Sequence, residues 1–164
     1  MSERELVQMM EFADEQVQRI FKVTQRIHPM WHMVTSAGET KIMPTPSAQD
    51  KDTAERLVRR IFELLDVVRY VFIGEAWTAE VMDEDLPKVE AELQRAGNLE
   101  NYPGRNEVVQ LQGEDRDCGQ LVWWRAITRP KIGPARLGPL EKDCFRVSSG
   151  RMVGLLPKAK ATQH

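Results

Sequence analysis

The sequence predicts an α+β fold: a single domain with a predominantly antiparallel sheet of about five to seven strands, two main helices packed on one face of that sheet, and a short extra helix. Two segments with apolar residues at helical spacing, several short strand-like segments, and short turns between those strands lead to this prediction. A length of 164 residues suits one domain, which we expect at residues 1–157 with a flexible tail at residues 158–164.

The first helix is expected to begin at Ser2. Ser2 and Glu5 have the spacing of a capping box, whose hydroxyl and carboxylate satisfy the exposed amides of a helix start. Apolar residues then recur at helical spacing: Leu6, Met10, Ala13, Val17, Ile20 and Ile27. Pro29 disfavours helical geometry at the preceding residue, so the helix is expected to end at His28.

Two short strands are expected within residues 30–43, because Gly38 can supply the positive φ of a tight reversal between them. Pro44 and Pro46 then favour an extended linker, since proline lacks an amide donor. The second helix is expected from Ser47. Its buried stripe would be Ala54, Leu57, Val58, Ile61, Leu64 and Leu65.

A strand from Tyr70 to about Thr78 follows, and its apolar run through Ile73 is typical of a central strand that is covered on both faces. Residues 83–96 predict the short extra helix, with a proline near its start and a glycine after its end.

Residues 107–128 give the clearest hairpin, two strands around an Asp- and Gly-rich turn. Residues 129–143 are rich in proline and glycine and are expected to connect without regular structure. Residues 143–157 are expected to add a last short hairpin that turns at Ser149 and Gly150.

The chain has no apolar run of the roughly 20 residues that span a bilayer, and charges replace the apolar core of a secretory signal near its start. We therefore expect a cytoplasmic protein without membrane contact. In that compartment Cys118 and Cys144 are expected to be free thiols, and two isolated cysteines do not make a zinc site.

The formal net charge of −2 conceals an asymmetry. Residues 1–124 hold 14 Lys and Arg against 23 Asp and Glu, a net charge of −9, whereas residues 125–164 hold 9 against 2, a net charge of +7. A basic end can meet nucleic acid or an acidic partner, or it can complement the protein's own acidic portion. We favour the last reading.

Glu75 raises a specific question, because this carboxylate ends the most apolar strand, two residues before Trp77. Strand alternation places both side chains on one face with large apolar neighbours. A carboxylate there pairs with a cation or acquires a raised pKa, and both conditions are common at functional sites. Alternatively, Glu75 emerges from the core and pairs with an arginine at the end of the sheet: Arg69, Arg105 or Arg125.

The 107–128 hairpin and the following loop supply a second group of candidates. The adjacent Trp123 and Trp124 must point to opposite faces of a strand, so one can fill the core while the other meets a partner. Arg125, Arg129 and Lys131 can bind carboxylate or phosphate, unless they only line a solvated sheet edge.

We therefore expect a binding or accessory protein without catalytic activity, metal or cofactor, which engages a protein partner or a second copy of itself through the 107–128 hairpin and the basic loop at residues 129–142. The expected contact residues are Glu75, Trp77, Trp124, Arg125, Arg129 and Lys131.

Two alternatives stay open. One is a metal-assisted hydrolase or nuclease that uses Glu75 with Glu114 or Asp115. The other is non-specific nucleic-acid binding through the basic C-terminal portion. Phosphate-loop, dinucleotide-binding, hydrolase-elbow and zinc-protease motifs do not occur in the sequence.

Overall fold

The computed structural model describes residues 2–79, 82–142 and 154–157. Its helices are α1 (Ser2–Thr24), α2 (Lys51–Leu65) and α3 (Leu86–Ala96), and the short 3-10 helix η1 (Asp83–Asp85) precedes α3. Its strands are β1 (Met30–Thr35), β2 (Thr40–Pro44), β3 (Val67–Ala79), β4 (Arg105–Asp115), β5 (Gly119–Thr128), β6 (Arg136–Leu137) and β7 (Glu141–Lys142).

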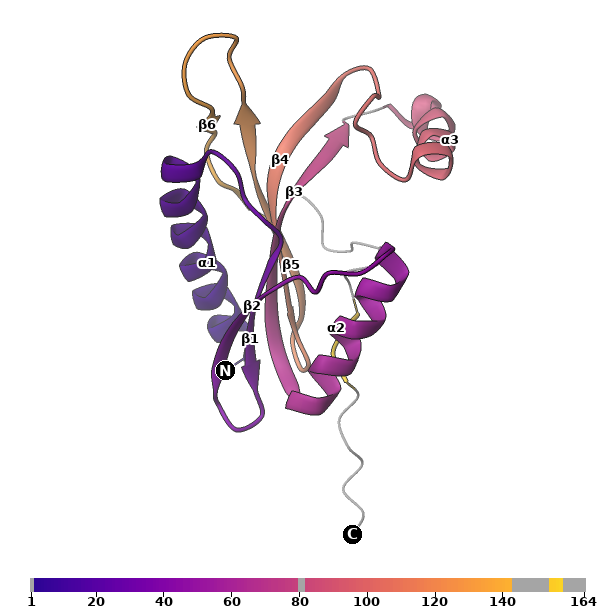
Figure 1. Ribbon diagram of the computed structural model, residues 1–164. Coiled ribbons are helices and arrows are strands. Elements are labelled where there is room, and N and C mark those ends of the chain that lie inside the picture. Colours follow the sequence, from indigo (N-terminus) through magenta and orange to yellow (C-terminus); the bar gives the residue numbers. More distant parts are fainter. Residues whose placement is uncertain (1, 80–81, 143–153, 158–164) are drawn as a thin grey trace.

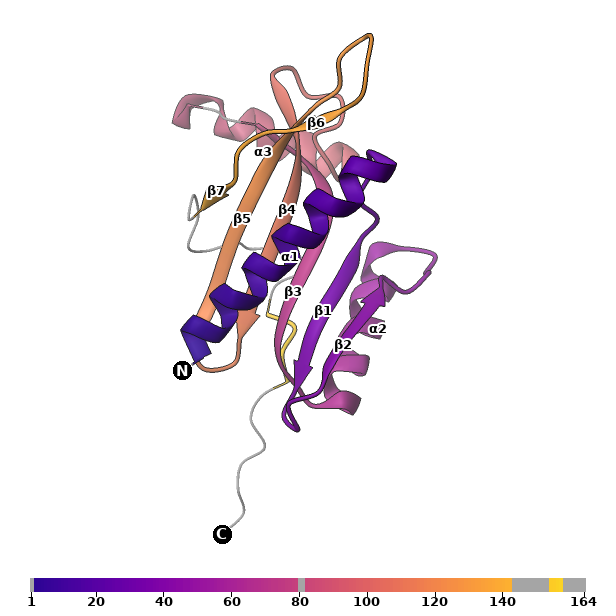
Figure 2. The same cartoon turned by 90° about the vertical axis from the view of Figure 1, so that its left-hand side faces the viewer.

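The strands form one sheet in the order β2-β1-β3-β4-β5-β6, and β7 pairs separately with β5. Every strand pairing among the described residues is antiparallel. Figures 1 and 2 show this sheet as a twisted layer with α1 crossing one face and α2 lying against the other. The predicted α+β class and predominantly antiparallel sheet are confirmed.

The prediction that both main helices pack on one face was wrong. Val71 and Ile73 of β3 belong to the core beneath α1, whereas Tyr70 and Phe72 pack with α2. These residues alternate along one strand, so the two helices cover opposite faces. The physical reason is that β3 is central and apolar on both sides, and each side must be removed from water.

The end of α1 and the start of α2 differ from those expected from the sequence. Thr24 is the last residue of α1, because Gln25 takes a left-handed conformation with φ 56° while its amide still bonds to the carbonyl of Phe21 at 2.8 Å. Asp50 caps the start of α2, its Oδ1 accepting a 2.7 Å hydrogen bond from the amide of Thr53.

The remaining elements follow the expected order, with one difference. The chain forms two of the three predicted hairpins, β1–β2 and β4–β5, and the extra helix α3. The connection after β5 is more regular than expected, since β6 and β7 pair with β5. The hairpin expected at residues 143–157 falls mainly outside the described residues, as does the tail at residues 158–164.

No helix in the described ranges combines the length and the apolar character that crossing a membrane requires.

Candidate functional site

Glu75 lies on the α1 face of the sheet, just beyond the end of α1. The backbone N–H of Ile27 donates a 2.8 Å hydrogen bond to Oε1 of Glu75, and Nη2 of Arg129 lies 3.5 Å from the same oxygen. Its side chain is 26% exposed. Glu75 therefore attaches the segment after α1 to the sheet, and its cationic partner is Arg129 instead of the three arginines proposed from the sequence.

Arg129 is the centre of this cluster. Its Nε lies 3.1 and 2.9 Å from the two carboxylate oxygens of Glu107, and Nη2 donates to Oε1 of Glu107 at 2.9 Å. Nη1 donates to the carbonyl of Gln25 at 3.0 Å. The hydrogen bonds to Glu107 are the main cause that raises the pKa of Arg129 above its usual value, and the charge of Glu75 adds to them. The guanidinium thus connects three separate parts of the chain.

An open hollow of about 450 Å³ adjoins this cluster. It is lined by Arg26, Glu75, Ala76, Trp77, Glu100, Glu107 and Arg129. The fold therefore brings three of the predicted residues together: Glu75, Trp77 and Arg129. The guanidinium carbon of Arg105 lies 5.4 Å from the centre of the half-buried Trp77 ring, close enough for a cation–π interaction.

The chemistry of this hollow suits binding better than proton transfer. Glu75 and Glu107 are both paired with the cationic Arg129. Within the described ranges, no group of three or more His, Cys, Asp or Glu side chains could hold a metal ion.

The proposed metal site that combines Glu75 with Glu114 or Asp115 was wrong, because the strand register separates them. Glu75 lies opposite Val109, and Glu114 is five residues further along β4, about 16 Å away. Glu114 instead accepts a 2.6 Å hydrogen bond from the hydroxyl of Tyr70.

Asp115 has a structural environment of its own. Its Oδ2 accepts a 2.7 Å hydrogen bond from Arg69, and its Oδ1 accepts from the amides of Asp117 and Cys118 in the β4–β5 turn. Burial by itself would raise the pKa of Asp115, but the Asp117 amide and Arg69 lower it overall. Asp115 therefore orders the hairpin turn.

Arg125 lies in the interface between α1 and β5. Its Nε and Nη2 donate to the two carboxylate oxygens of Asp14 at 2.7 and 2.8 Å, and its Nη1 donates to the carbonyl of Gly138 at 2.9 Å. Trp123 belongs to the core beneath α1, so the half-buried Trp124 points to the opposite face. The fold thus does not bring Trp124 and Arg125 together with Arg129 and Lys131.

Residues 129–135 form a loop that projects between β5 and β6 (Figures 1 and 2). Its Ile132 is 93% exposed, and Lys131 beside it is exposed too. Arg129 holds the first end of this loop, and the amide of Ala135 near the other end donates to Oε1 of Gln25 at 3.2 Å. Sequence reasoning did not single out Ile132. The sequence did contain a signal for it: an aliphatic residue lies between Lys131 and a glycine, in a segment rich in proline and glycine that was not expected to form regular structure.

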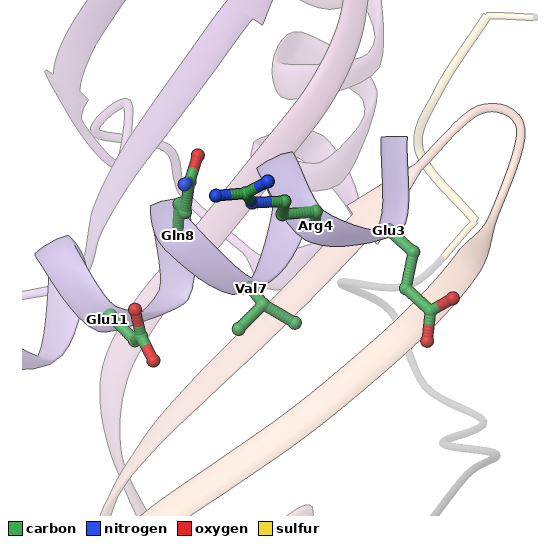
Figure 3. A pocket seen from close by; sticks show the side chains of 5 residues that line it. All are labelled: Glu3, Arg4, Val7, Gln8 and Glu11. Atoms are coloured by element: carbon green, nitrogen blue, oxygen red, sulfur yellow. The ribbon is translucent and has the colours of Figure 1, made fainter. Parts of the chain in front are cut away.

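A second hollow follows the first half of α1. Its lining is Glu3, Arg4, Val7, Gln8 and Glu11, all from one helix. Figure 3 shows Glu3, Val7 and Glu11 pointing away from Arg4 and Gln8. These side chains do not converge on a common point, so they do not make a site for a small ligand.

The strongest candidates for function are therefore the hollow around Arg129 and the projecting loop that Arg129 anchors. Both belong to the same end of the sheet, where the chain after α1 meets the end of β5. Comparisons of this chain with protein-family models, with curated proteins and with solved structures found no match.

Proposed function

We propose that this chain is a binding or accessory protein that engages a protein partner through the loop at residues 129–135. The observation that carries the proposal is the 93% exposure of Ile132 on that projecting loop. A large aliphatic side chain in water gains free energy when a partner covers it. A fully buried aliphatic anchor of this kind is worth about 1.5–3 kcal/mol.

The anchoring of the loop supports this role. Arg129 fixes one end through Glu107 and Gln25, and the amide of Gly138 donates to the carbonyl of Ala126 at 2.8 Å just beyond the other end. A loop held in this way loses less conformational entropy on binding than a free segment would. Ile132 is thus presented on a fixed base.

The charge around Ile132 indicates the chemistry of the partner. Residues 129–140 contain no Asp or Glu. Arg129 is paired with Glu107, while Lys131 and Arg136 flank Ile132 and are exposed. The matching surface is an apolar pocket on a protein, bordered by carboxylates, since opposite charges steer association and fix the orientation of the complex.

The test is affinity capture from a lysate of the natural host, with and without nuclease, followed by identification of the retained proteins. The wild type, Ile132→Asp and Leu64→Ser are compared. Leu64 is 69% exposed on α2 and serves as the matched control on another element. We expect the wild type and Leu64→Ser to retain the same stoichiometric protein, and Ile132→Asp to lose it.

Affinity for the identified partner should fall by about thirtyfold or more in Ile132→Asp, as for a residue at the centre of an interface. Retention of one protein by all three forms would refute the role of the loop. Retention that disappears with nuclease would instead support nucleic-acid binding, and affinity should then collapse as salt rises.

A further inference from the structure

Residues 154–157, Gly-Leu-Leu-Pro, pack between α2 and the face of the sheet opposite α1. Figure 1 shows this segment in yellow beside α2. Leu155 is 2% exposed and belongs to a core cluster with residues of α2, β1 and β3. The other buried members are Trp31, Met33, Val58, Phe62, Val67 and Tyr70. Leu156 packs partly against the same cluster.

Side chains from two elements bind the backbone of Gly154 on both sides. Nη1 of Arg59, on α2, donates to the carbonyl of Gly154 at 2.6 Å. The amide of Gly154 donates to Oε2 of Glu114, on β4, at 2.9 Å. Arg59 and Glu114 therefore bind one backbone acceptor and one backbone donor of a bent segment whose Gly154 has φ 65°, a conformation that favours glycine.

The acceptor for the Gly154 amide is also bound by a buried side chain of β3. The hydroxyl of Tyr70 donates a 2.6 Å hydrogen bond to the same Oε2 of Glu114, and Tyr70 is only 1% exposed. Burial first, and then the charge of Glu114, raises the pKa of Tyr70, so the hydroxyl remains the donor. A buried hydroxyl aimed at the carboxylate fixes its position for an incoming amide.

None of the described strand pairings includes residues 154–157. The segment is instead attached by one buried leucine, a second leucine packed partly beside it, and side-chain hydrogen bonds to the backbone of Gly154 and of Leu155. Such an attachment can open without breaking the sheet.

We infer that the groove between α2 and the sheet is a peptide-docking site for a bent segment with a glycine followed by two leucines, and that residues 154–157 of the same chain are its occupant. This inference does not depend on the loop at residues 129–135. The groove supplies an apolar pocket for the first leucine, and Arg59 and Glu114 bind the backbone that precedes it.

Amide hydrogen exchange of the intact protein is the first test. If the segment docks separately, the Gly154 amide should exchange through local opening, on the order of a hundredfold faster than the slowest amides of the β3–β4 ladder. Exchange of Gly154 only with global unfolding would overturn the inference, because the segment would then be an inseparable part of the core.

Peptide binding is the second test. A fluorescent peptide with the sequence of residues 152–159 is titrated against the wild type and against full-length Leu155→Ala. The variant should bind it on the order of tenfold more tightly than the wild type, whose own segment competes at high effective concentration. A peptide with alanine in place of its first leucine is the control and should not bind.

Equal affinity of both proteins for the peptide, or no binding by a folded Leu155→Ala protein, would overturn the inference. Light scattering tests whether the segment instead docks in a second copy of the chain. A dimer that is lost in Leu155→Ala would place the segment in a second copy of the chain, and the assignment to the same chain would then be wrong.

Discussion

The guanidinium of Arg125 on β5 donates two hydrogen bonds to the carboxylate of Asp14 on α1, at 2.7 Å and 2.8 Å. The two side chains are only 14% and 8% exposed. The hydrogen bond to Asp14 is the main cause that raises the pKa of Arg125. This pair joins the longest helix to the sheet at a place where neither partner has ready access to water.

Arg125→Ala should therefore destabilise the fold. Removing one partner of a largely buried pair leaves the other charge uncompensated, which typically lowers the free energy of unfolding by about 3–5 kcal/mol. Urea denaturation measures the effect, and a double variant, Asp14→Leu with Arg125→Met, should recover much of the loss. Arg60→Ala is the control, because its pair with Glu63 is exposed and worth at most about 1 kcal/mol. If both single variants cost the same, the pair does not hold α1.

Glu75 should act through its hydrogen bond to the Ile27 amide. Ile27 is 3% exposed, so Glu75→Ala would leave a largely buried N–H without its acceptor and lower the free energy of unfolding by about 1–3 kcal/mol. Glu75→Gln keeps an acceptor oxygen and should cost clearly less. Thermal unfolding of the two variants measures whether Glu75→Gln loses less stability than Glu75→Ala. Equal losses in both would show that the charge facing Arg129 matters more than the hydrogen bond.

Much of the fold could be predicted because its elements leave local signals. Gly38 and the Asp- and Gly-rich turn mark the two hairpins, and Gly97 ends α3 with φ 75°. The packing faces could not be predicted in the same way. A stripe such as Leu6, Met10 and Ala13 shows that a helix has a buried side, but it does not show which side of the sheet that helix covers.

The candidate site was predicted in part. Alternation put Glu75 and Trp77 on one face of the apolar strand, and both line the same hollow, because alternation depends on neighbouring residues alone. The partners of the charged groups are far apart in sequence: Arg129 lies 54 residues after Glu75, and 111 residues separate Arg125 from Asp14. Strand register and helix placement decide those contacts, and neither is a local property of the chain.

A side chain at Gly113 on β4 should destabilise the fold, because two buried side chains of α1 lie close to it. A Cβ atom there would be 2.7 Å from Sδ of Met10 and 3.0 Å from Cδ1 of Leu6, two fully buried residues. Gly113→Ala should lower the free energy of unfolding by about 1–3 kcal/mol, as overpacking of a core does.

Gly138→Ala is the matched control for Gly113→Ala. The nearest atom to a Cβ at Gly138 is Cβ of Ala126 at 3.5 Å, an ordinary contact. Chemical denaturation of both variants should show the loss at Gly113 alone. Adding Met10→Ala to Gly113→Ala should cost less than the sum of the two single changes, because the smaller side chain relieves the clash. Strict additivity would mean that α1 moves away from β4 freely.

His32 on β1 should make stability depend on pH. It is 2% exposed, its ring centre lies 5.8 Å from that of Phe12, and burial lowers its pKa below the ordinary value of 6.5. The unfolded chain therefore binds the proton first. The contribution of neutral His32 is complete above pH 6.5 and is lost as pH falls through the lower pKa of the folded state, with a slope of at most about 1.4 kcal/mol per pH unit.

Urea unfolding between pH 8 and pH 5, at intervals of about half a unit, measures this slope. His32→Gln cannot take up a proton and should flatten the curve below pH 6.5, whatever the change costs at pH 8. His28→Gln, which removes an exposed histidine a few residues earlier, is the control variant. A curve for His32→Gln that runs parallel to the wild type would show that protons bind elsewhere on unfolding, and that the neutral state of His32 does not stabilise the fold.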